Sequence, residues 1–183
     1  VQASASHVLA EGVHAEWLVL TGVTAIDATG NSLDNTISGN AGSNRLDGGA
    51  GTDTLSYATS ATAVAMNLAT GSVVGQGTDT IAGFERVVGS NLADTIDGGS
   101  GADILNGGGG ADLLRGHGGA DLYIVDHAAD VIDETGTAPG ELDLVEASLS
   151  WTLGANLERL QLVGTAADGI GNDLANRIVG NAS

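Results

Sequence analysis

The stretch GGSGADILN (98–106), GGGGADLLR (107–115), GHGGADLYI (116–124) repeats one nine-residue pattern three times without a gap. Glycine dominates the first half of each copy, aspartate holds the sixth position, and an apolar residue holds the eighth. A flexible glycine-rich linker would share this composition but would not keep a fixed register. The register therefore indicates an array of short structural repeats.

Further copies of the nonamer lie on both sides of this stretch. They are GNSLDNTIS (30–38), GNAGSNRLD (39–47), GGAGTDTLS (48–56), GSNLADTID (89–97) and GNDLANRIV (171–179). The sixth position is always Asp or Asn: Asn35, Asn44, Asp53, Asp94, Asp103, Asp112, Asp121 and Asn176. The eighth is always apolar: Ile37, Leu46, Leu55, Ile96, Leu105, Leu114, Tyr123 and Ile178.

The nonamer divides into a turn and a strand. We expect the first six residues to form a tight turn with left-handed backbone angles, which glycine accepts without steric cost. The last three residues suffice only for a short strand, with the apolar middle side chain facing inward. Two nonamers then make one coil, so that turns on the same side lie 18 residues apart in a parallel β-roll, as Asp103 and Asp121 do.

Composition and charge restrict the kinds of molecule or ion that the chain can bind. The net charge is −18, there are 30 glycines and no cysteine, and all five basic residues are arginine. Nucleic acid and anionic membrane surfaces are disfavoured because no basic patch can meet their phosphates. No transmembrane segment of 18 or more apolar residues and no signal peptide is visible, and disulfide stapling is excluded. A chain this acidic favours a divalent cation as its partner.

Calcium is the cation that this pattern suits. The turn directs several carbonyl oxygens toward one point, the Asp adds a carboxylate there, and calcium takes six to eight oxygen ligands. Stacked carboxylates repel each other, and an ion between them converts repulsion into attraction. Ordering so many glycines is entropically costly. We therefore expect the repeat blocks to be largely disordered without calcium.

These nonamers resemble the repeats-in-toxin (RTX) family of secreted bacterial proteins, also called haemolysin-type calcium-binding repeats. The likeness is most specific in 48–56 and 98–124, and the stretches 121–134 and 153–164 resemble the spacers of large RTX proteins. The resemblance implies an all-β fold, a right-handed parallel β-roll or β-solenoid. It also implies export by type I secretion machinery and folding on Ca²⁺ outside the cell.

The resemblance implies a ligand set in which two turns share one ion. The earlier turn offers the carbonyls of positions two and four and its Asp, and the later turn offers those of positions one and three and its Asp. The best site then uses Gly99, Gly101, Asp103, Gly116, Gly118 and Asp121. A second site uses Ser90, Leu92, Asp94, Gly107, Gly109 and Asp112, with Leu92 standing where glycine is expected.

Two weaker sites complete the set that the resemblance implies. One pairs Gly108, Gly110 and Asp112 with Val125, His127 and Asp130, although the later turn has lost its glycines. The other pairs the turn 30–35 with Gly48, Ala50 and Asp53, with one carboxylate fewer because Asn35 replaces Asp. Whether the Asn-bearing block 30–47 binds calcium stays open. The expected total is roughly two to five ions.

The chain divides into repeat blocks and β spacers. We expect partial spacer strands in 1–29, the first block in 30–56, a spacer in 57–88, the main calcium-binding block in 89–134, a spacer in 135–170 and a further block from 171 to 183. Apolar residues alternate with small or polar ones in 62–68 and 144–153, which indicates strands. Helical periodicity is not sustained anywhere.

Residues outside the main repeats receive structural interpretations. Asp79 and Asp143 resemble degenerate single turns, and we expect them on the solvated surface rather than at an ion. Glu16, Glu85 and Glu158 recur at matching places, which favours a structural role at a coil corner. We expect Trp17 and Trp151 to fill the core or a corner, and His117 to face solvent.

No enzyme motif is recognisable. The sequence holds neither the H-E-x-x-H pattern of zinc proteases nor the G-x-S-x-G elbow of hydrolases, and His7, His14, His117 and His127 lie in different segments. An acid/base pair among the many carboxylates is not excluded by pattern, but the repeat explains most of them. The sequence predicts a non-catalytic calcium-binding module of a larger protein, secreted or on the bacterial cell surface.

Two alternatives stay open at this point. The chain could be an accessory module of a secreted polysaccharide-modifying enzyme, protease or lipase. It could also be an adhesin or surface-layer repeat with a cell-surface or polysaccharide partner, for which the low aromatic content of 3% gives little support.

Overall fold

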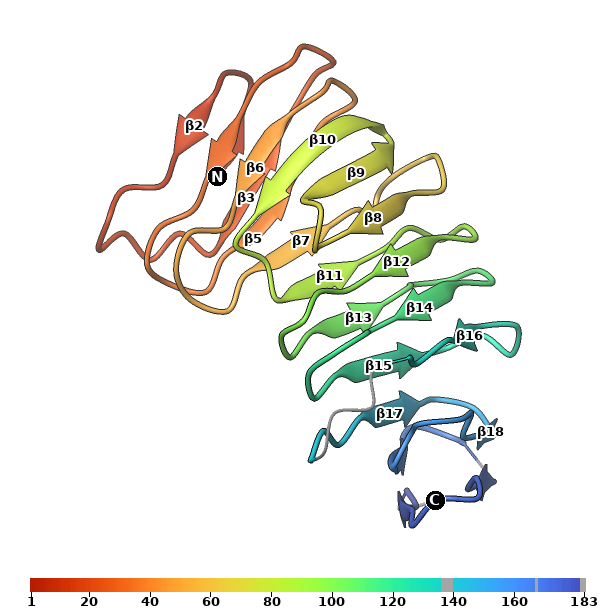
Figure 1. The fold of residues 1–183 in the computed structure, drawn as a ribbon. Helices are drawn as coiled ribbons and strands as arrows, with labels where there is room; N and C mark the ends of the chain where they lie inside the picture. Colours follow the sequence, from red (N-terminus) through yellow and green to blue (C-terminus); the bar gives the residue numbers. More distant parts are fainter. Residues whose placement is uncertain (136–139, 167, 182–183) are drawn as a thin grey trace.

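The computed structural model describes residues 1–135, 140–166 and 168–181, and every regular element in them is a β-strand. The chain alternates between two sheets, whose strands are mostly parallel, and so forms a β-solenoid. Figure 1 shows its coils stacked from the N-terminus to the C-terminus. The predicted all-β roll is confirmed. Within the described residues, no helix is long and apolar enough to cross a membrane.

Sheet A holds ten of the described strands, and its neighbours are parallel throughout. In spatial order they are β1 (Gln2–Ala3), β3 (Trp17–Leu20), β5 (Thr36–Ser38), β7 (Thr54–Ser56), β11 (Arg86–Val88), β13 (Ile104–Asn106), β15 (Leu122–Val125), β17 (Leu144–Ala147), β19 (Arg159–Leu162) and β21 (Arg177–Val179).

Sheet B lies across the roll from sheet A and holds nine of the described strands. In spatial order they are β16 (Val131–Ile132), β14 (Leu113–Arg115), β12 (Thr95–Asp97), β8 (Ala65–Asn67), β9 (Ser72–Gly75), β10 (Gly77–Ala82), β6 (Arg45–Asp47), β4 (Ala28–Thr29) and β2 (His7–Val8). A small third sheet pairs β18 (Trp151–Thr152) with β20 (Gly169–Ile170).

The nonamer register predicted from the sequence is confirmed. Ile104 pairs with Leu122 in sheet A and Thr95 pairs with Leu113 in sheet B, so equivalent residues lie 18 positions apart. The middle residue of each three-residue nonamer strand points inward. Seven of the eight residues at position eight are fully buried and form one apolar column: Ile37, Leu46, Leu55, Ile96, Leu105, Leu114 and Tyr123. The eighth, Ile178, lies on the outermost strand β21 and is 42% exposed.

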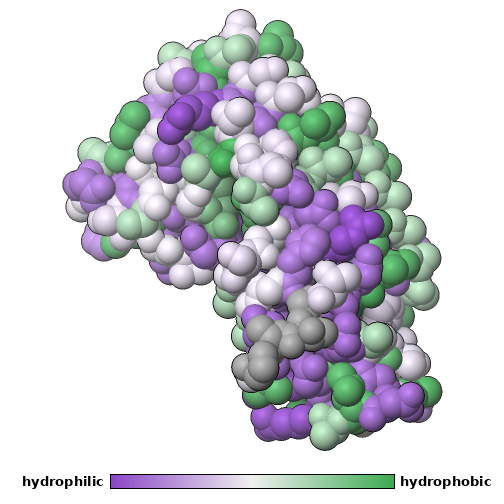
Figure 2. All heavy atoms as spheres, in the orientation of Figure 1, coloured by the Kyte–Doolittle hydropathy of each residue, from purple (hydrophilic) through white to green (hydrophobic). Residues whose placement is uncertain are grey.

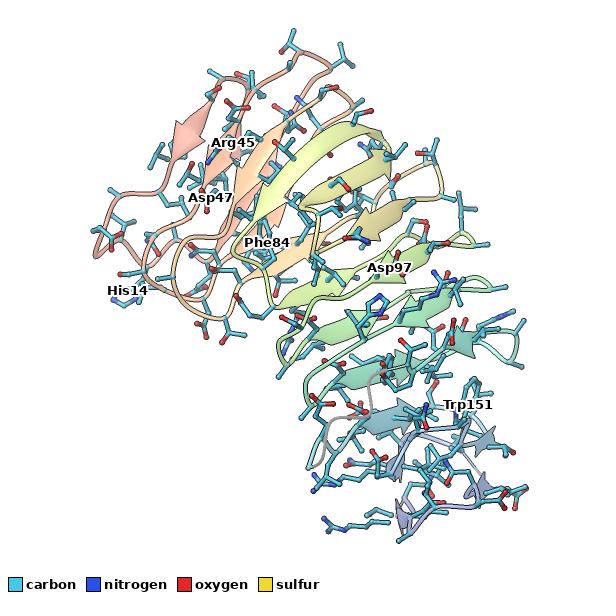
Figure 3. All side chains as sticks on the ribbon, viewed as in Figure 1. His14, Arg45, Asp47, Phe84, Asp97 and Trp151 are labelled. Atoms are coloured by element: carbon cyan, nitrogen blue, oxygen red, sulfur yellow. The ribbon has the colours of Figure 1, made fainter. Side chains whose placement is uncertain are left out.

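An antiparallel insertion interrupts the roll after the first block. β9 runs antiparallel to both β8 and β10, so sheet B has three strands where sheet A has only β7. Since neighbouring strands lie about 4.8 Å apart, the two extra strands lengthen sheet B by roughly 10 Å. Figure 1 shows the N-terminal coils inclined to the later ones at this point, and Figure 3 shows Phe84 beside it. Phe84 is buried there.

The expected spacer strands form, but they are shorter than the alternating pattern. In 62–68 only β8 is a strand, with Val64 and Met66 buried. In 144–153 the chain leaves sheet A after β17 and enters the third sheet at β18. The alternation marks which side chains point inward but does not show where the chain turns a corner.

The nonamer turns fall into two kinds that the sequence pattern did not separate. In the turns 48–53, 107–112 and 116–121, the second and fourth residues have positive φ, and we call these left-handed turns. The residues are Gly49, Gly51, Gly108, Gly110, His117 and Gly119, with φ from 71° to 130°. The turns 30–35, 39–44, 89–94 and 98–103, which we call plain turns, have no positive φ at these positions. The left-handed angles expected for every turn are therefore found in only three of the described ones.

Two glycines at the same nonamer position test this distinction. Gly110 has φ of 128°, and a Cβ there would lie 2.6 Å from the carbonyl oxygen of Leu92. Gly101 has no positive φ, and a Cβ there would meet nothing within 4 Å. We expect Gly110→Ala to lower the free energy of unfolding by about 1–3 kcal/mol or more, because alanine is strained at that φ. Gly101→Ala should be neutral or slightly stabilising.

Urea denaturation of both variants in saturating calcium measures the difference. Equal losses of stability in the two variants would show that the two kinds of turn are not distinct in solution.

Candidate metal sites

Carboxylates form a row along the edge of the roll where the chain enters sheet A. We call Asp53, Glu85, Asp103, Asp121, Asp143 and Glu158 the first row; each immediately precedes a strand of sheet A, the four aspartates are buried, and the two glutamates are half-buried. Within the row, the backbone N–H of one residue donates to a carboxylate oxygen one coil later. Examples are Asp103 N to Asp121 Oδ1 and Asp121 N to Asp143 Oδ1, both 2.8 Å. The row therefore joins successive coils.

A second row follows the opposite edge, where the chain enters sheet B. It consists of Asp79, Asp94, Asp112 and Asp130, all buried. Asp94 N donates to Asp112 Oδ1 at 2.8 Å, and Asp112 N donates to Asp130 Oδ1 at 3.1 Å. In most members of both rows, one carboxylate oxygen accepts an N–H group of the neighbouring coil; Asp103 is an exception, because the N–H of Glu85 donates to the carbonyl oxygen of Asp53 instead.

The other carboxylate oxygen distinguishes the two kinds of turn. In plain turns it accepts an N–H from its own turn: Gly99 N donates to Asp103 Oδ2 at 2.7 Å, and Ser90 N donates to Asp94 Oδ2 at 2.5 Å. In left-handed turns it is buried and has no hydrogen-bond partner within the described part of the chain. These oxygens are Oδ2 of Asp53, Asp112 and Asp121.

The backbone of the left-handed turn explains the missing partner. In 107–112, the N–H of Gly108 donates to Asn106 Oδ1 at 2.9 Å instead of to Asp112. The equivalent N–H in the plain turn 98–103, that of Gly99, reaches Asp103. The left-handed turn therefore leaves one carboxylate oxygen free to bind an ion. A buried oxygen without any partner lowers the stability of the fold.

Carbonyl oxygens gather between each plain turn and the left-handed turn stacked on it. A Cβ built on Gly108 would lie 2.2 Å from the carbonyl oxygen of Ser90, and one built on Gly119 would lie 2.3 Å from that of Gly101. These are carbonyls of positions two and four in the earlier turn. From the later turn, the carbonyl oxygen of Gly107 would lie 2.3 Å from a Cβ on Gly89. An all-oxygen donor set of this kind suits a hard cation such as calcium.

The sequence-predicted residues of the two best sites are thus brought together in stacked turns. Gly118 N donates to Gly99 O at 3.5 Å, which places the turn carrying Gly101 and Asp103 against the one carrying Gly116 and Asp121. The turn 89–94, with Ser90 and Leu92, stacks in the same way on 107–112, with Gly109. Leu92 stands where glycine was expected, but it does not have a positive φ, so its side chain causes no backbone strain in this plain turn.

The two weaker predicted sites differ from each other. In the first block, the turn 30–35 stacks on 48–53: Ala50 N donates to Asn31 O at 3.3 Å, and Asp53 keeps an oxygen without a partner in the described chain. In the other, Asp130 Oδ2 already accepts the N–H of His127 at 3.1 Å. The first block therefore has the better donor set, although it has one carboxylate fewer.

Burial disfavours ionisation of these carboxylates. Desolvation, with the nearby charges of Asp130 and Asp94, raises the pKa of Asp112 to about 6. Desolvation, with the charges of Asp143, Asp103 and Glu134, raises the pKa of Asp121 to about 7.

The shift recurs along the first row. Desolvation is also the largest cause that raises the pKa values of Asp53 and Asp103. These are buried anions held close to one another, which is the situation that a divalent cation relieves.

Arginine does not supply the missing positive charge. The described ion pairs of Arg45 and Arg115 reach Asp47, Asp97 and Asp133, and none of them involves a carboxylate of either row. These pairs lie on the outer surface, where Figure 3 labels Asp47 and Asp97 and Figure 2 shows hydrophilic residues over the coils below the bend. The rows therefore lack a protein cation in the described structure.

The expectation for Asp79 and Asp143 was wrong. Both are buried, not on the solvated surface, and both are members of a row. Asp79 Oδ1 accepts the N–H of Asn44 at 2.8 Å, and Tyr57 donates its hydroxyl proton to Asp79 Oδ2. Each stands immediately before or within a strand that continues a sheet, a position equivalent to the sixth of a nonamer. That position relative to the strand was the signal in the sequence that could have placed both residues in a row.

The expectation for the recurring glutamates is confirmed for Glu85 and Glu158, whereas Glu16 stands at the equivalent place before β3 but is exposed. Glu85 Oε2 accepts the N–H of Asp53 at 3.0 Å, and Glu158 Oε2 accepts that of Asp143 at 3.1 Å. The longer side chain of glutamate fills the place that aspartate takes in the nonamers. Sequence reasoning missed Glu134, which is buried near Asp121 and Asp143.

The aromatic and histidine expectations had mixed outcomes. Trp17 is 64% exposed, so the expectation of a core or corner filler was wrong for it. Trp151, labelled in Figure 3, packs against the core as expected. The side chain of His117 is 44% exposed and so faces solvent, as expected.

Comparison with known proteins supports this description of the turns. The family model described as RTX calcium-binding nonapeptide repeat (4 copies) matches residues 29–58 and 88–123. No curated protein matches the chain. The two matched segments contain all three left-handed turns, with Asp53, Asp112 and Asp121. The chain therefore carries RTX calcium-binding nonapeptide repeats, folded as a parallel β-roll.

Proposed function

We propose that this chain is a non-catalytic calcium-binding module that folds on binding Ca²⁺ outside the cell, as part of a larger type I-secreted or surface bacterial protein. The observation that carries the proposal is the set of buried carboxylate oxygens without a partner among the described residues, Oδ2 of Asp53, Asp112 and Asp121. All three belong to left-handed turns. Secretion and the extracellular setting follow from the RTX repeats alone.

The strongest proposed site lies between the turns 98–103 and 116–121. Asp103 and Asp121 supply carboxylate oxygens, and Gly99, Gly101, Gly116 and Gly118 supply carbonyls. The second lies between 89–94 and 107–112, with Ser90, Leu92, Gly107 and Gly109 around Asp94 and Asp112. A weaker third site uses Asp53 with Gly48 and Ala50. When bound, calcium supplies positive charge and oxygen coordination, and the protein groups hold it.

Calcium-driven folding follows from the energetics of the rows. A buried carboxylate that must stay ionised costs several kcal/mol unless a cation pairs with it. Each ion bound only by the folded state adds about 2.7 kcal/mol at a hundredfold excess over its Kd. Two or three ions would thus contribute about 5–8 kcal/mol, which is comparable to the whole stability of a small domain.

Circular dichroism during a calcium titration tests the proposal. At pH 7.5 in chelator we expect little β-structure in the repeat blocks, and a cooperative gain as calcium is added. Asp121→Asn keeps the shape of the side chain but removes its charge, so it should shift the titration midpoint to higher calcium by about tenfold or more. Asp173→Asn makes the same change of charge at an exposed residue and should leave the midpoint nearly unchanged.

Two results would contradict the proposal. One is full β-structure in chelator that calcium does not change. The other is an equal shift of the midpoint in Asp121→Asn and Asp173→Asn, since general charge reduction would then explain both.

Protons compete with calcium for the same carboxylates. Asp112 and Asp121 have folded-state pKa values of about 6 and about 7, above the value of about 3.9 of an unfolded aspartate. Without calcium, the folded state therefore binds more protons than the unfolded state between about pH 4 and pH 7. Its stability is present below this window and is lost as the pH rises through it.

The pH dependence should consequently have opposite signs with and without calcium. In chelator, we expect β-structure to increase when the pH is lowered from about 7.5 to about 5. In subsaturating calcium, the same change should release ions and lower the stability. Asp121→Asn, which cannot titrate at that position, should reduce the gain in chelator. A gain of the same size in wild type and variant would exclude Asp121 as a source of the pH dependence.

A further inference from the structure

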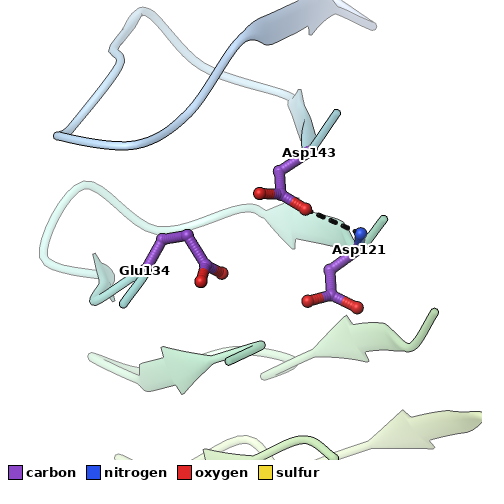
Figure 4. Close-up of side chains that lie close together, drawn as sticks. All are labelled: Asp121, Glu134 and Asp143. Atoms are coloured by element: carbon purple, nitrogen blue, oxygen red, sulfur yellow. Dashed lines mark hydrogen bonds between the residues drawn. The ribbon is translucent and has the colours of Figure 1, made fainter. Parts of the chain in front are cut away.

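Three buried carboxylates converge where the regular nonamer pattern ends. Asp121 closes the last left-handed turn, Glu134 follows β16, and Asp143 precedes β17. All three are buried, and one oxygen from each lies within 4.8 Å of the others. Figure 4 shows the three side chains together, with Asp143 accepting the backbone N–H of Asp121.

The spacing of these oxygens matches a calcium ion. Calcium–oxygen distances are about 2.3–2.6 Å, so two ligands on opposite sides of one ion lie about 4.8 Å apart. Ligands at smaller angles lie closer together. The three oxygens, which lie within 4.8 Å of one another, are therefore close enough to share one ion.

The cluster also contains an oxygen that nothing in the described chain satisfies. Asp121 is 2% exposed, and its Oδ2 is buried without a hydrogen-bond partner there. A Cβ built on Gly116 would lie 2.1 Å from this oxygen and 2.3 Å from the hydroxyl oxygen of Tyr123. Any side chain at residue 116 would thus enter the cluster, and glycine leaves the place open.

Tyr123 holds Glu134 in position. Its hydroxyl donates to Glu134 Oε2 and accepts the N–H of Gly116 at 2.9 Å. Tyr123 replaces the aliphatic residue found at position eight of the other nonamers, and its ring fills the same buried column. The tyrosine therefore links the apolar core to the carboxylate cluster and fixes the direction of the Glu134 side chain.

We propose that Asp121, Glu134 and Asp143 form a further calcium site, built from three side-chain carboxylates at the junction between the repeat block and the spacer that follows it. The inference rests on the proposed function for the identity of the ion; it shares Asp121 with the turn-pair site between 98–103 and 116–121, whereas Glu134 and Asp143 belong to this site alone. The glycine-rich turn pairs use carbonyls and two carboxylates, whereas this site uses a glutamate outside the nonamers. Its ion fastens the coil of β15 and β16 to β17, which extends calcium dependence into the spacer.

Counting bound ions tests the site. Equilibrium dialysis of the whole 183-residue chain with radioactive calcium gives the number bound and their affinities. Glu134→Gln removes one carboxylate with little change in volume, and we expect it to bind one ion fewer, or to bind that ion about tenfold or more weakly. Glu146→Gln is the matched control: it lies on β17, faces outward from the core, and loses the same charge. It should bind as many ions as wild type.

A second variant guards against a general loss of folding. Glu134→Asp keeps the charge but shortens the side chain, so it should keep the number of ions and weaken one of them. Asp103→Asn should instead weaken the turn-pair site and leave the Glu134-dependent ion in place. Circular dichroism in excess calcium shows whether each variant has the β content of wild type.

The outcomes separate this site from the proposed function. Wild type that binds calcium, with Glu134→Gln equal to it in number and affinity, would overturn this site alone. Wild type that binds no calcium would overturn both. A loss confined to Glu134→Gln, with Glu146→Gln unaffected, supports the site.

Discussion

The hydrogen bond from a backbone N–H to the buried carboxylate of the next coil is the interaction on which this roll depends. It repeats along both edges, as from Asp103 to Asp121 and from Asp94 to Asp112. Each such bond joins two coils whose paired strands are mostly only three or four residues long. It also places anions in a buried column, where their mutual repulsion and desolvation oppose folding. The same groups therefore stabilise the stack and make it dependent on a cation.

The two kinds of turn differ in how far they depend on a bound cation. A plain turn satisfies the second carboxylate oxygen from its own backbone, as Gly99 does for Asp103. In a left-handed turn that N–H does not reach the carboxylate, so the second oxygen can bind an ion, as at Asp112 and Asp121. Stacking one kind on the other places a carboxylate whose second oxygen is hydrogen-bonded opposite one whose second oxygen has no partner in the described chain, with carbonyls between them. The left-handed backbone at positions two and four therefore marks where an ion is needed. Glycine alone does not decide it, because Gly99 and Gly101 hold these positions in a plain turn and His117 holds one of them in a left-handed turn.

Much of the fold follows from the sequence, because the nonamer carries its own register. Position eight predicted the buried column, and the 18-residue coil predicted the pairing of Ile104 with Leu122. The antiparallel strand β9 was missed because Val73 and Val74 form a short apolar run whose direction depends on the tight turn Gly75-Gln76-Gly77. The turn-pair residues were implied by the family resemblance, whereas Glu134 comes near Asp121 only through the path of the chain after β16. Asp79 and Asp143 were misplaced because each stands in an isolated, incomplete copy of the nonamer, although the rows need only a carboxylate before or within a strand.

Amide hydrogen exchange at the donors of the rows tests the central claim most directly. The N–H groups of Asp94, Asp103 and Asp121 donate to the carboxylates of the next coil, so their exchange reports whether the rows are formed. At pH 7 the account predicts strong protection of these amides in saturating calcium and exchange close to that of an unfolded chain in chelator. Equal protection in both conditions would contradict it, because the rows would then form without a cation.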